Sequence, residues 1–512
     1  MPITKLYFLL MIVIFLVIYY IIPRRYQWYA LLAGSMGFYI LFAGVKGFAF
    51  LLVAGTIAWI AGVGMEGCKS EKVRSILFWI SFIFIFGILF VFQYSDFVVS
   101  NLDRILGLFH MEKQWKLWEK TAPIGISFYS LSLLSYVIDV YWKIQKTQTN
   151  LAKVLLFGCY FPSITTGPVL RYHELENQFY RGHRFNYKKV SFGTQRVFWG
   201  LFKKLVIAER LAILVNQVYG SYLEYTGIEI VGATFVAAVR IYMDFSASMD
   251  IVLGISSAFG IDLPENFNHP FFAETLAEFW RRWHITLGLW LKDYVYYPVM
   301  KSSLLQKISR YCREHFGKKA GKRTATFLAM LVLWVCNGIW HGGAWKYILG
   351  VGITTWFFIL IEELLEPYIN AFCDRVHINR KALWYIWLRR GKTFVMFSCT
   401  VLFFFSQSFW EGLDIYSHIV TNMGFMSIGA FALRLKNLLL SCYCQYEFLQ
   451  LCYGLAIYMV VSVLNRQGDL QEKVAGLLLP LRWGLYYLLF FSVILFAANG
   501  VNVMEGFLYA NF

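Results

Sequence analysis

Two histidines lie in stretches of sequence that are otherwise apolar. His341 follows Asn337 by four residues in the run 331–345, and His284 lies in the aromatic segment 278–298. An ionisable side chain inside an apolar span is costly and is a functional candidate by default. A neutral imidazole can take a proton from a hydroxyl group, and an amide one helical turn away can orient the ring or stabilise an oxyanion. His341 and Asn337 therefore predict acid–base chemistry on a hydroxyl group.

Both histidine segments also have a purely structural interpretation. His341 could be a buried histidine that a neighbouring helix satisfies by hydrogen bonding. The segment 278–298 carries Arg281 and Arg282 among aromatic residues. That composition also fits an amphipathic helix whose aromatic and basic residues lie at the level of the lipid headgroups.

A third group of polar residues interrupts the apolar stretch 228–259. Its members are Asp244, Ser246, Ser248 and Asp250. Buried carboxylates of this kind must line a polar cavity or pair with cations. Pairing is the interpretation we favour, and Arg281 and Arg282 are the expected partners.

The composition is that of a membrane protein. Of the 512 residues, 59% are hydrophobic and 15% are charged, and the mean hydropathy is +0.55. Several apolar runs approach or reach the roughly 20 residues that a helix needs to cross a hydrocarbon core. The clearest are 6–22, 48–65, 75–94, 392–410 and 484–498. They lack the alternation of a barrel. The prediction is an all-α polytopic membrane protein with roughly eleven or twelve crossings plus re-entrant or short helices.

One membrane domain is expected over residues 1–512. Residues 1–94 predict conventional spanning helices that form a scaffold. From 121 to 410, the apolar segments are shorter and are interrupted by proline, glycine and charged residues. Irregular backbone at membrane depth persists only where it is buried in protein or lines a water-filled cavity. This middle region is therefore expected to enclose the site, and residues 411–512 add C-terminal helices.

The basic residues predict an orientation in the membrane. The net charge is +17, and the Lys and Arg residues gather between the apolar runs, at 24–25, 69–74, 301–323 and 375–392. The positive-inside rule explains this pattern without a nucleic-acid partner. The first run, 6–22, could be a signal peptide, but no small-x-small cleavage site follows it. We expect a retained helix with its N-terminus outside.

Six sequence motifs occur in order along the chain. They are 123–129 with 135–141, 161–162 with 167–171, 244–246 with Asp250, 263–268, 279–287 with 291–294, and 340–345. Together they resemble the membrane-bound O-acyltransferase superfamily, and specifically its bacterial alginate O-acetyltransferase and teichoic-acid D-alanyltransferase branch.

The resemblance implies roles for particular residues. His341 is expected to be the catalytic histidine, and His284 the second family histidine, near a cytoplasmic donor entrance. The implied fold is a ring of helices around a thin core with a central tunnel. Further residues are expected to line that tunnel or bind substrate: Arg171, Asp244, Ser246, Asp250, Trp280, Arg281, Arg282 and Trp340.

The aromatic C-terminus suggests a further participant. The chain ends Phe507-Leu-Tyr-Ala-Asn-Phe512, which resembles the Phe-x-Tyr-x-x-Phe ending of the alginate-type relatives. In that branch the tyrosine is thought to carry the acyl group, so the resemblance implies an acyl-O-tyrosine intermediate on Tyr509, activated by His341. An aromatic anchor at the membrane interface is the structural alternative.

The expected activity is O-acylation across a bacterial cell membrane. An acetyl group is expected from a cytoplasmic thioester, either acetyl-CoA or an acyl carrier, for a surface polysaccharide. D-Alanyl transfer to teichoic acid and transport of a lipid-linked glycan without acyl chemistry are the alternatives. No permanently bound cofactor is expected, and nine cysteines without a paired CxxC spacing predict no metal site. The expected partners are membrane lipids, the cytoplasmic donor and an extracellular esterase-like protein.

Overall fold

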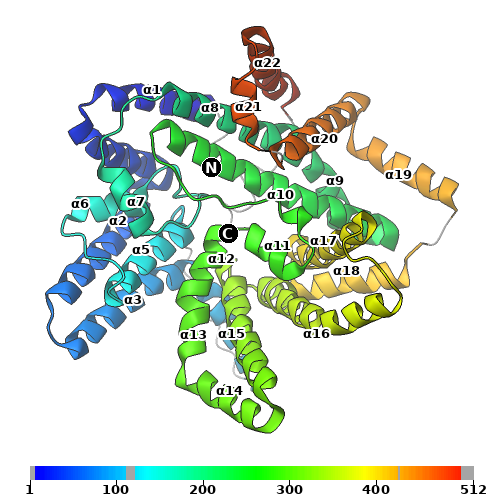
Figure 1. The fold of residues 1–512 in the computed structure, drawn as a ribbon, viewed down its shortest axis with the longest axis horizontal. Coiled ribbons are helices and arrows are strands. Elements are labelled where there is room, and N and C mark those ends of the chain that lie inside the picture. Colours follow the sequence, from blue (N-terminus) through cyan, green and yellow to red (C-terminus); the bar gives the residue numbers. More distant parts are fainter. Residues whose placement is uncertain (1–5, 111–121, 425–426, 467, 498–512) are drawn as a thin grey trace.

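The protein is an assembly of helices in the computed structural model, which describes residues 6–110, 122–424, 427–466 and 468–497 (Figure 1). Within these residues the only β pairing is an isolated bridge between Phe267 and Trp283. The predicted all-α class is therefore confirmed.

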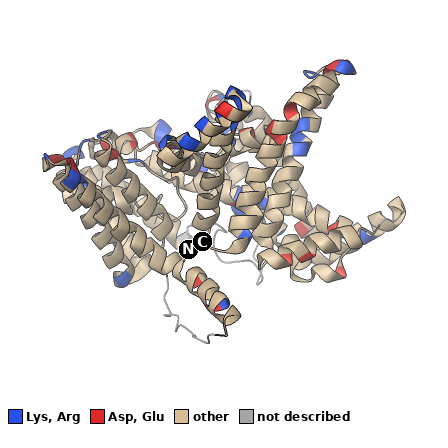
Figure 2. Ribbon diagram, turned by 90° about the horizontal axis from the view of Figure 1, so that it is seen from below, with Lys and Arg blue, Asp and Glu red and all other residues tan. Residues whose placement is uncertain are grey.

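Six helices of the described residues are long and apolar enough to cross a membrane. They are Arg24–Gly67, Glu71–Gln93, Lys318–Trp340, Lys346–Arg375, Gln445–Arg466 and Leu479–Phe496, and two shorter apolar helices are Tyr7–Ile21 and Ile126–Tyr141. The protein is a multi-pass membrane protein, as predicted. The predicted total of about eleven or twelve crossings stays a prediction. Many charged residues lie along one margin of the molecule, the upper one in Figure 2.

The N-terminal part of the described chain is helical. They are α1 (Leu6–Ile21), η1 (Arg24–Tyr26), α2 (Gln27–Gly67), α3 (Glu71–Gln93) and α4 (Ser95–Leu108). Gly44 has a φ of 71° and divides α2 into two helices across a kink, a conformation that glycine adopts without steric cost. In α1, Phe8 and Tyr19 are buried in the core, so this helix packs as part of the fold.

The central helices are shorter and more deeply buried. They are α5 (Ile126–Tyr141), α6 (Leu151–Cys159), α7 (Tyr172–Tyr180), α8 (Tyr187–Phe202), η2 (Lys203–Ala208), α9 (Glu209–Gly220), η3 (Tyr222–Glu224) and α10 (Gly227–Ala258). With 16 residues, α5 is about 24 Å long, less than the ~30 Å of a typical hydrocarbon core. Nearly all of its side chains are buried. Helix α5 is therefore buried in protein and is shorter than a typical hydrocarbon core is thick.

Helix α10 runs through the middle of the molecule beside α8 (Figure 1). The two helices approach closely at Gly193 and Gly254, where a Cβ atom on either glycine would lie within 2.5 Å of the other's carbonyl oxygen. Most side chains of α10 are buried, including those of Glu229, Arg240 and Asp244. Helix α10 is thus the element against which the site is built.

The remaining helices surround this centre. They are η4 (Pro270–Phe272), α11 (Leu276–Arg282), α12 (Ile285–Leu291), η5 (Lys292–Tyr296), α13 (Tyr297–Lys301), α14 (Ser303–Phe316), α15 (Lys318–Trp340), η6 (Lys346–Ile353), α16 (Thr354–Arg375), α17 (Leu383–Phe405), α18 (Phe409–Thr421), α19 (Ile428–Cys442), α20 (Gln445–Arg466), α21 (Leu470–Ala475) and α22 (Leu479–Phe496). The segment 278–298 is broken at His284 into α11 and α12. It is not the continuous amphipathic helix of the alternative interpretation.

Candidate active site

His341 lies at the C-terminal end of α15, where the chain reverses. Its backbone N–H donates to the Asn337 carbonyl oxygen at 3.2 Å, and its φ of −72° and ψ of 15° leave the helical region. Gly342 and Gly343 follow with φ angles of 120° and 63°, which residues with a side chain rarely adopt. The glycines allow the sharp reversal that leaves His341 and Asn337 on the last turn of α15, both buried.

A cavity of about 500 Å³ adjoins His341. Its wall includes Gln93 from α3, Ser127 from α5 and Thr165 from the loop before α7, besides His341 and Tyr347. The Ser127 hydroxyl donates to Gln93 Oε1 at 2.7 Å. The volume is within the range of small-molecule sites. A hydroxyl-bearing ligand in this cavity would meet an imidazole and several hydrogen-bonding groups.

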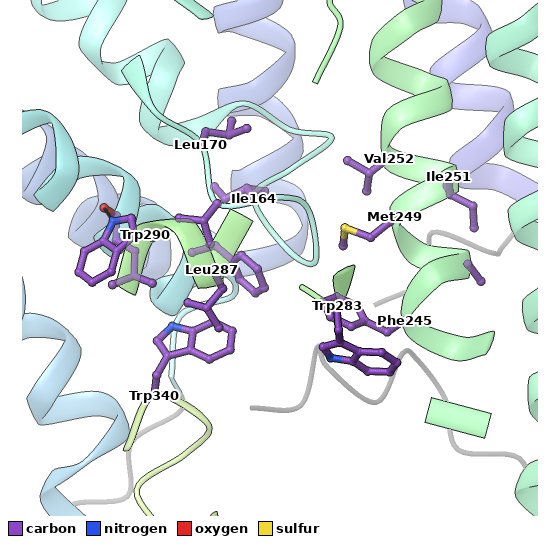
Figure 3. Close-up of a cluster of buried hydrophobic side chains, with 14 of the residues drawn as sticks. Ile164, Leu170, Phe245, Met249, Ile251, Val252, Trp283, Leu287, Trp290 and Trp340 are labelled. Carbon is purple, nitrogen blue, oxygen red and sulfur yellow. Dashed lines mark hydrogen bonds between the residues drawn. The ribbon is translucent and has the colours of Figure 1, made fainter. Parts of the chain in front are cut away.

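His284 and His341 both pack beside the Trp340 indole. The ring centroids of His284 and Trp340 are 5.7 Å apart, and those of Trp340 and His341 are 4.9 Å apart. Phe245 of α10 packs edge-on against His284, with centroids 4.8 Å apart. In Figure 3, Trp340 lies in the same buried cluster as Leu287 and Ile164. The structure therefore brings both predicted histidines into contact with one buried indole.

The carboxylates of α10 pair with lysines that the sequence analysis did not single out. Lys204 Nζ lies 2.6 Å from Asp244 Oδ1 and 2.7 Å from Glu209 Oε1. Lys203 Nζ lies 2.7 Å from Asp250 Oδ2 and donates to the Ser246 hydroxyl at 2.8 Å. In the structure these carboxylates therefore pair with buried cations, which is the interpretation favoured from the sequence.

The predicted identity of those cations was wrong. Arg281 is exposed, and Arg282 pairs with Glu278 one turn earlier on α11. The lysines come instead from η2, whose wide helical turn lies against α10. The signal was present in the sequence, because Lys203 and Lys204 are adjacent charges inside the apolar run 197–208.

A second cavity of about 780 Å³ lies between α8 and α10 on one side and α20 and α22 on the other. Arg196, Ser246, Asp250 and Glu265 contribute polar groups to its wall. Of the residues predicted to line a tunnel, Ser246 and Asp250 therefore do border a cavity. His269, in the loop after α10, also borders it, and burial, followed by the charges of Arg466 and Arg282, lowers the pKa of His269.

The other predicted lining residues are absent from the walls of both cavities. Trp280 stacks edge-on against Trp334, with ring centroids 4.9 Å apart. Arg171 Nη1 pairs with Asp293 Oδ2 at 2.7 Å. Tyr509 lies outside the residues that the structure describes. Among the described residues, no group of three or more histidine, cysteine, aspartate or glutamate residues could hold a metal ion.

Arg171 belongs to a separate polar cluster in which three of the sequence motifs meet. Tyr294, next to Asp293, donates its hydroxyl to Asp139 Oδ1 of α5 at 2.8 Å. His173 Nδ1 lies 3.5 Å from the other oxygen of Asp139. The motifs at 135–141, 167–171 and 291–294 are therefore joined by charge and hydrogen bonding at the end of α5.

Asn266 is a polar residue in contact with His284 that sequence reasoning missed. Its side-chain Oδ1 lies 3.4 Å from His284 Nδ1, and the residue is fully buried. The motif 263–268 contains it, but nothing in that motif by itself indicates a contact with a histidine 18 residues later.

Comparison with known proteins identifies the family. Residues 77–313 match the model of MBOAT, the membrane-bound O-acyltransferase family, a stretch that includes His284 and ends before His341. The chain is 31% identical over 376 residues to the probable alginate O-acetylase of Azotobacter vinelandii, covering 71% of this chain and 68% of that protein.

Two more distant relatives carry other names. The peptidoglycan O-acetyltransferase of Helicobacter pylori is 28% identical over 288 residues, half of each chain. The teichoic acid D-alanyltransferase of Bacillus subtilis is 25% identical over 282 residues, or 50% of this chain and 65% of that protein. The chain therefore belongs to the membrane-bound O-acyltransferase family and is an acyltransferase.

Proposed function

We propose that this acyltransferase O-acetylates a polysaccharide outside the bacterial cell membrane, with His341 as the general base. The observation that carries the proposal is the buried imidazole of His341 in the wall of the 500 Å³ cavity. The names of the relatives support the chemistry, because an alginate O-acetylase and a peptidoglycan O-acetyltransferase both acetylate hydroxyl groups of glycans.

Each acyl transfer moves a proton from the attacking hydroxyl to the leaving group and exchanges one acyl partner for another. His341 removes the proton of the accepting hydroxyl as its oxygen attacks the thioester carbonyl carbon. The carbon–sulfur bond then breaks, and the proton goes to the departing thiolate. The products are an O-acetyl ester and a free thiol. His284, which packs against the same Trp340 indole as His341, serves the donor side of the same reaction.

The basic loops support a direction for the transfer. Helix α3 begins at Glu71, within the basic segment 69–74, and ends at Gln93 in the wall of the 500 Å³ cavity. With basic segments in the cytoplasm, that cavity opens toward the outside and serves the acceptor. The donor, acetyl-CoA or an acyl carrier, then approaches from the cytoplasm, and the N-terminus of α1 lies outside.

Two further participants belong to the proposal. The Tyr509 phenol is the accepting hydroxyl of a first transfer, in which His341 removes its proton and an O-acyl-tyrosine forms. In a second transfer the acceptor hydroxyl attacks the carbonyl carbon of this ester, the bond to the Tyr509 oxygen breaks, and the acceptor's proton goes to the departing phenolate. A separate extracellular esterase-like protein completes the transfer to the polymer, and membrane lipids surround the helices.

D-Alanyl transfer is the second candidate, since the teichoic acid D-alanyltransferase is a more distant relative. The two differ in the ester they form, so mass spectrometry of alkali-released acyl groups distinguishes acetate from D-alanine. Transport of a glycan without acyl chemistry is disfavoured because the family is one of acyltransferases.

The test of the catalytic assignment measures ester-linked acetate in the envelope polysaccharide of cells that express each variant at equal level. His341→Ala is expected to abolish acetylation. The matched control is His377→Ala, which removes an exposed histidine between α16 and α17 and should leave acetylation unchanged. Normal acetylation in His341→Ala would remove His341 from the mechanism.

Mass spectrometry of the C-terminal peptide should find an acyl group on Tyr509, and full activity of Tyr509→Phe would leave that residue as an anchor.

A further inference from the structure

His284 occupies an unusual backbone conformation between two short helices. Its φ is 46° and its ψ is 51°, in the left-handed region. Residues with a side chain adopt this region at an energetic cost, although histidine tolerates it better than most. The neighbouring structure must therefore hold the turn in place. The groups that hold it come from the loop after α10.

The loop 262–268 bonds to the chain on both sides of His284. Before it, the N–H of Asn268 donates to the Arg282 carbonyl oxygen at 2.9 Å. After it, the N–H of Ile285 donates to the Asn266 carbonyl oxygen at 3.0 Å. The Asn266 side chain adds two bonds, since its Oδ1 accepts from the N–H of Thr286 at 3.0 Å and from the Thr286 hydroxyl at 2.9 Å.

These bonds fix which way the Asn266 amide faces. A backbone N–H only donates, so the side-chain atom that faces the N–H of Thr286 must be the oxygen. That same oxygen lies 3.4 Å from Nδ1 of His284. An amide oxygen only accepts, so the contact places the imidazole hydrogen on Nδ1 and the lone pair on Nε2. The amide nitrogen faces Met249 Sδ of α10 at 3.1 Å.

The two ends of this arrangement are themselves anchored. Arg196 of α8 binds both carboxylate oxygens of Glu265, each at 2.7 Å, and also reaches Asp250 Oδ1 at 2.9 Å. On the other side, the Thr286 hydroxyl accepts from the N–H of Val169 at 3.0 Å. Asn266 is therefore held relative to α8, α10 and the loop before α7, and it cannot rotate without breaking several bonds at once.

We infer that Asn266 is a positioning residue for acyl transfer, which acts by fixing the rotation and the tautomer of His284. The inference rests on the proposed function, since it assigns His284 a part in the reaction. Asn266 fulfils for His284 the orienting role that a hydrogen-bonded neighbour has for catalytic histidines in general. Thr286 takes part by fixing the direction of the amide.

A double-mutant cycle tests the inference by the initial rate at which ester-linked acetate accumulates in the envelope polysaccharide after induction, at equal protein level. Asn266→Ala is expected to lower the rate about tenfold or more, because a misdirected catalytic group loses effective concentration. His284→Ala should lower it further. The double variant should be no slower than His284→Ala, because Asn266 can have no positioning effect once the His284 imidazole is absent.

Thr286 supplies a matched pair of variants that keeps the test valid if Asn266→Ala fails to fold. Thr286→Val removes the hydroxyl and keeps the shape, so the rate should fall. Thr286→Ser keeps the hydroxyl and should stay near the wild-type rate. If the rate of the double variant fell by the product of the fold-decreases seen in Asn266→Ala and His284→Ala, the two residues would act independently and the inference would be overturned. A wild-type rate in Asn266→Ala would also overturn it. A wild-type rate in His284→Ala would instead overturn the proposed role of His284 itself.

Discussion

At the scale of single residues, the site depends on how one histidine is presented at the end of a helix. His341 lies on the last turn of α15, and Gly342 turns the chain with a φ of 120°. There is space for a methyl group at position 342, since a Cβ on Gly342 would meet only Tyr347, at 3.6 Å. The constraint on Gly342 is therefore its backbone conformation rather than space.

Gly342→Ala is accordingly expected to reduce acetylation. Strain of roughly 1–3 kcal/mol at this φ can be relieved only by moving the turn that carries His341. We expect a rate about tenfold lower, measured as ester-linked acetate at equal protein level. Gly391→Ala is the control, because this exposed glycine of α17 has nothing within 4 Å and alanine favours a helix. Equal rates for the two variants would contradict the prediction.

At the scale of elements, helix packing in the core depends on buried ion pairs. Lys204 links Asp244 of α10 to Glu209 of α9, and the side chains of all three are at most 7% exposed. Charges at this depth are stable only when each has its partner, because removing one leaves the others buried without compensation. The η2 turn therefore fixes α8, α9 and α10 relative to one another.

Lys204→Met should destabilise the protein by about 3–5 kcal/mol, since Asp244 and Glu209 would lose their shared cation. Thermal unfolding in detergent measures the effect. Lys188→Met provides the comparison, because its pair with Glu472 is exposed on both sides and such pairs contribute about 0–1 kcal/mol. Similar melting temperatures for the two variants would show that the buried network contributes little.

The cluster at the end of α5 makes a second prediction for element packing. Tyr294→Phe removes the hydroxyl that donates to the buried Asp139 carboxylate, which should cost about 1–3 kcal/mol. Tyr297→Phe, at an exposed neighbouring tyrosine, should leave the melting temperature unchanged. If Tyr294→Phe melts like the wild type, the hydrogen bond does not tie η5 to α5.

At the scale of the whole molecule, a further prediction concerns the orientation of the protein in the membrane. The 500 Å³ cavity includes Gln93, at the far end of α3 from the basic segment 69–74. The other end of the protein carries Lys143, just after α5, which pairs with Glu71 at 3.1 Å. These two ends are therefore expected on opposite sides of the bilayer.

Thiol labelling of intact cells tests this orientation. Ser100→Cys, on the exposed face of α4, should react with a membrane-impermeant thiol reagent added outside. Lys143→Cys should react only after the cells are permeabilised. Both variants are made with Cys444 and Cys452, the exposed native thiols, replaced by serine. The opposite pattern would exchange the donor and acceptor sides of the proposed function.

The sequence by itself determined the class of the protein and its principal residues. Apolar runs of sufficient length can satisfy their backbone in lipid only as helices, so the helical membrane fold followed from composition and spacing. The exceptional cost of an ionisable group in such a run pointed to His341, His284 and the carboxylates of α10 without reference to any contact.

Only the tertiary structure decided which residues meet. Charge alone suggested Arg282 as the partner of the α10 carboxylates, whereas helix packing brings Lys203 and Lys204 to them. The same packing places His284 and His341 against one indole, that of Trp340. The contact of Asn266 with His284 depends on a loop that returns to the chain 18 residues later. Hydrogen bonds and ion pairs act over a few ångströms, and the sequence order does not specify such distances between separate elements.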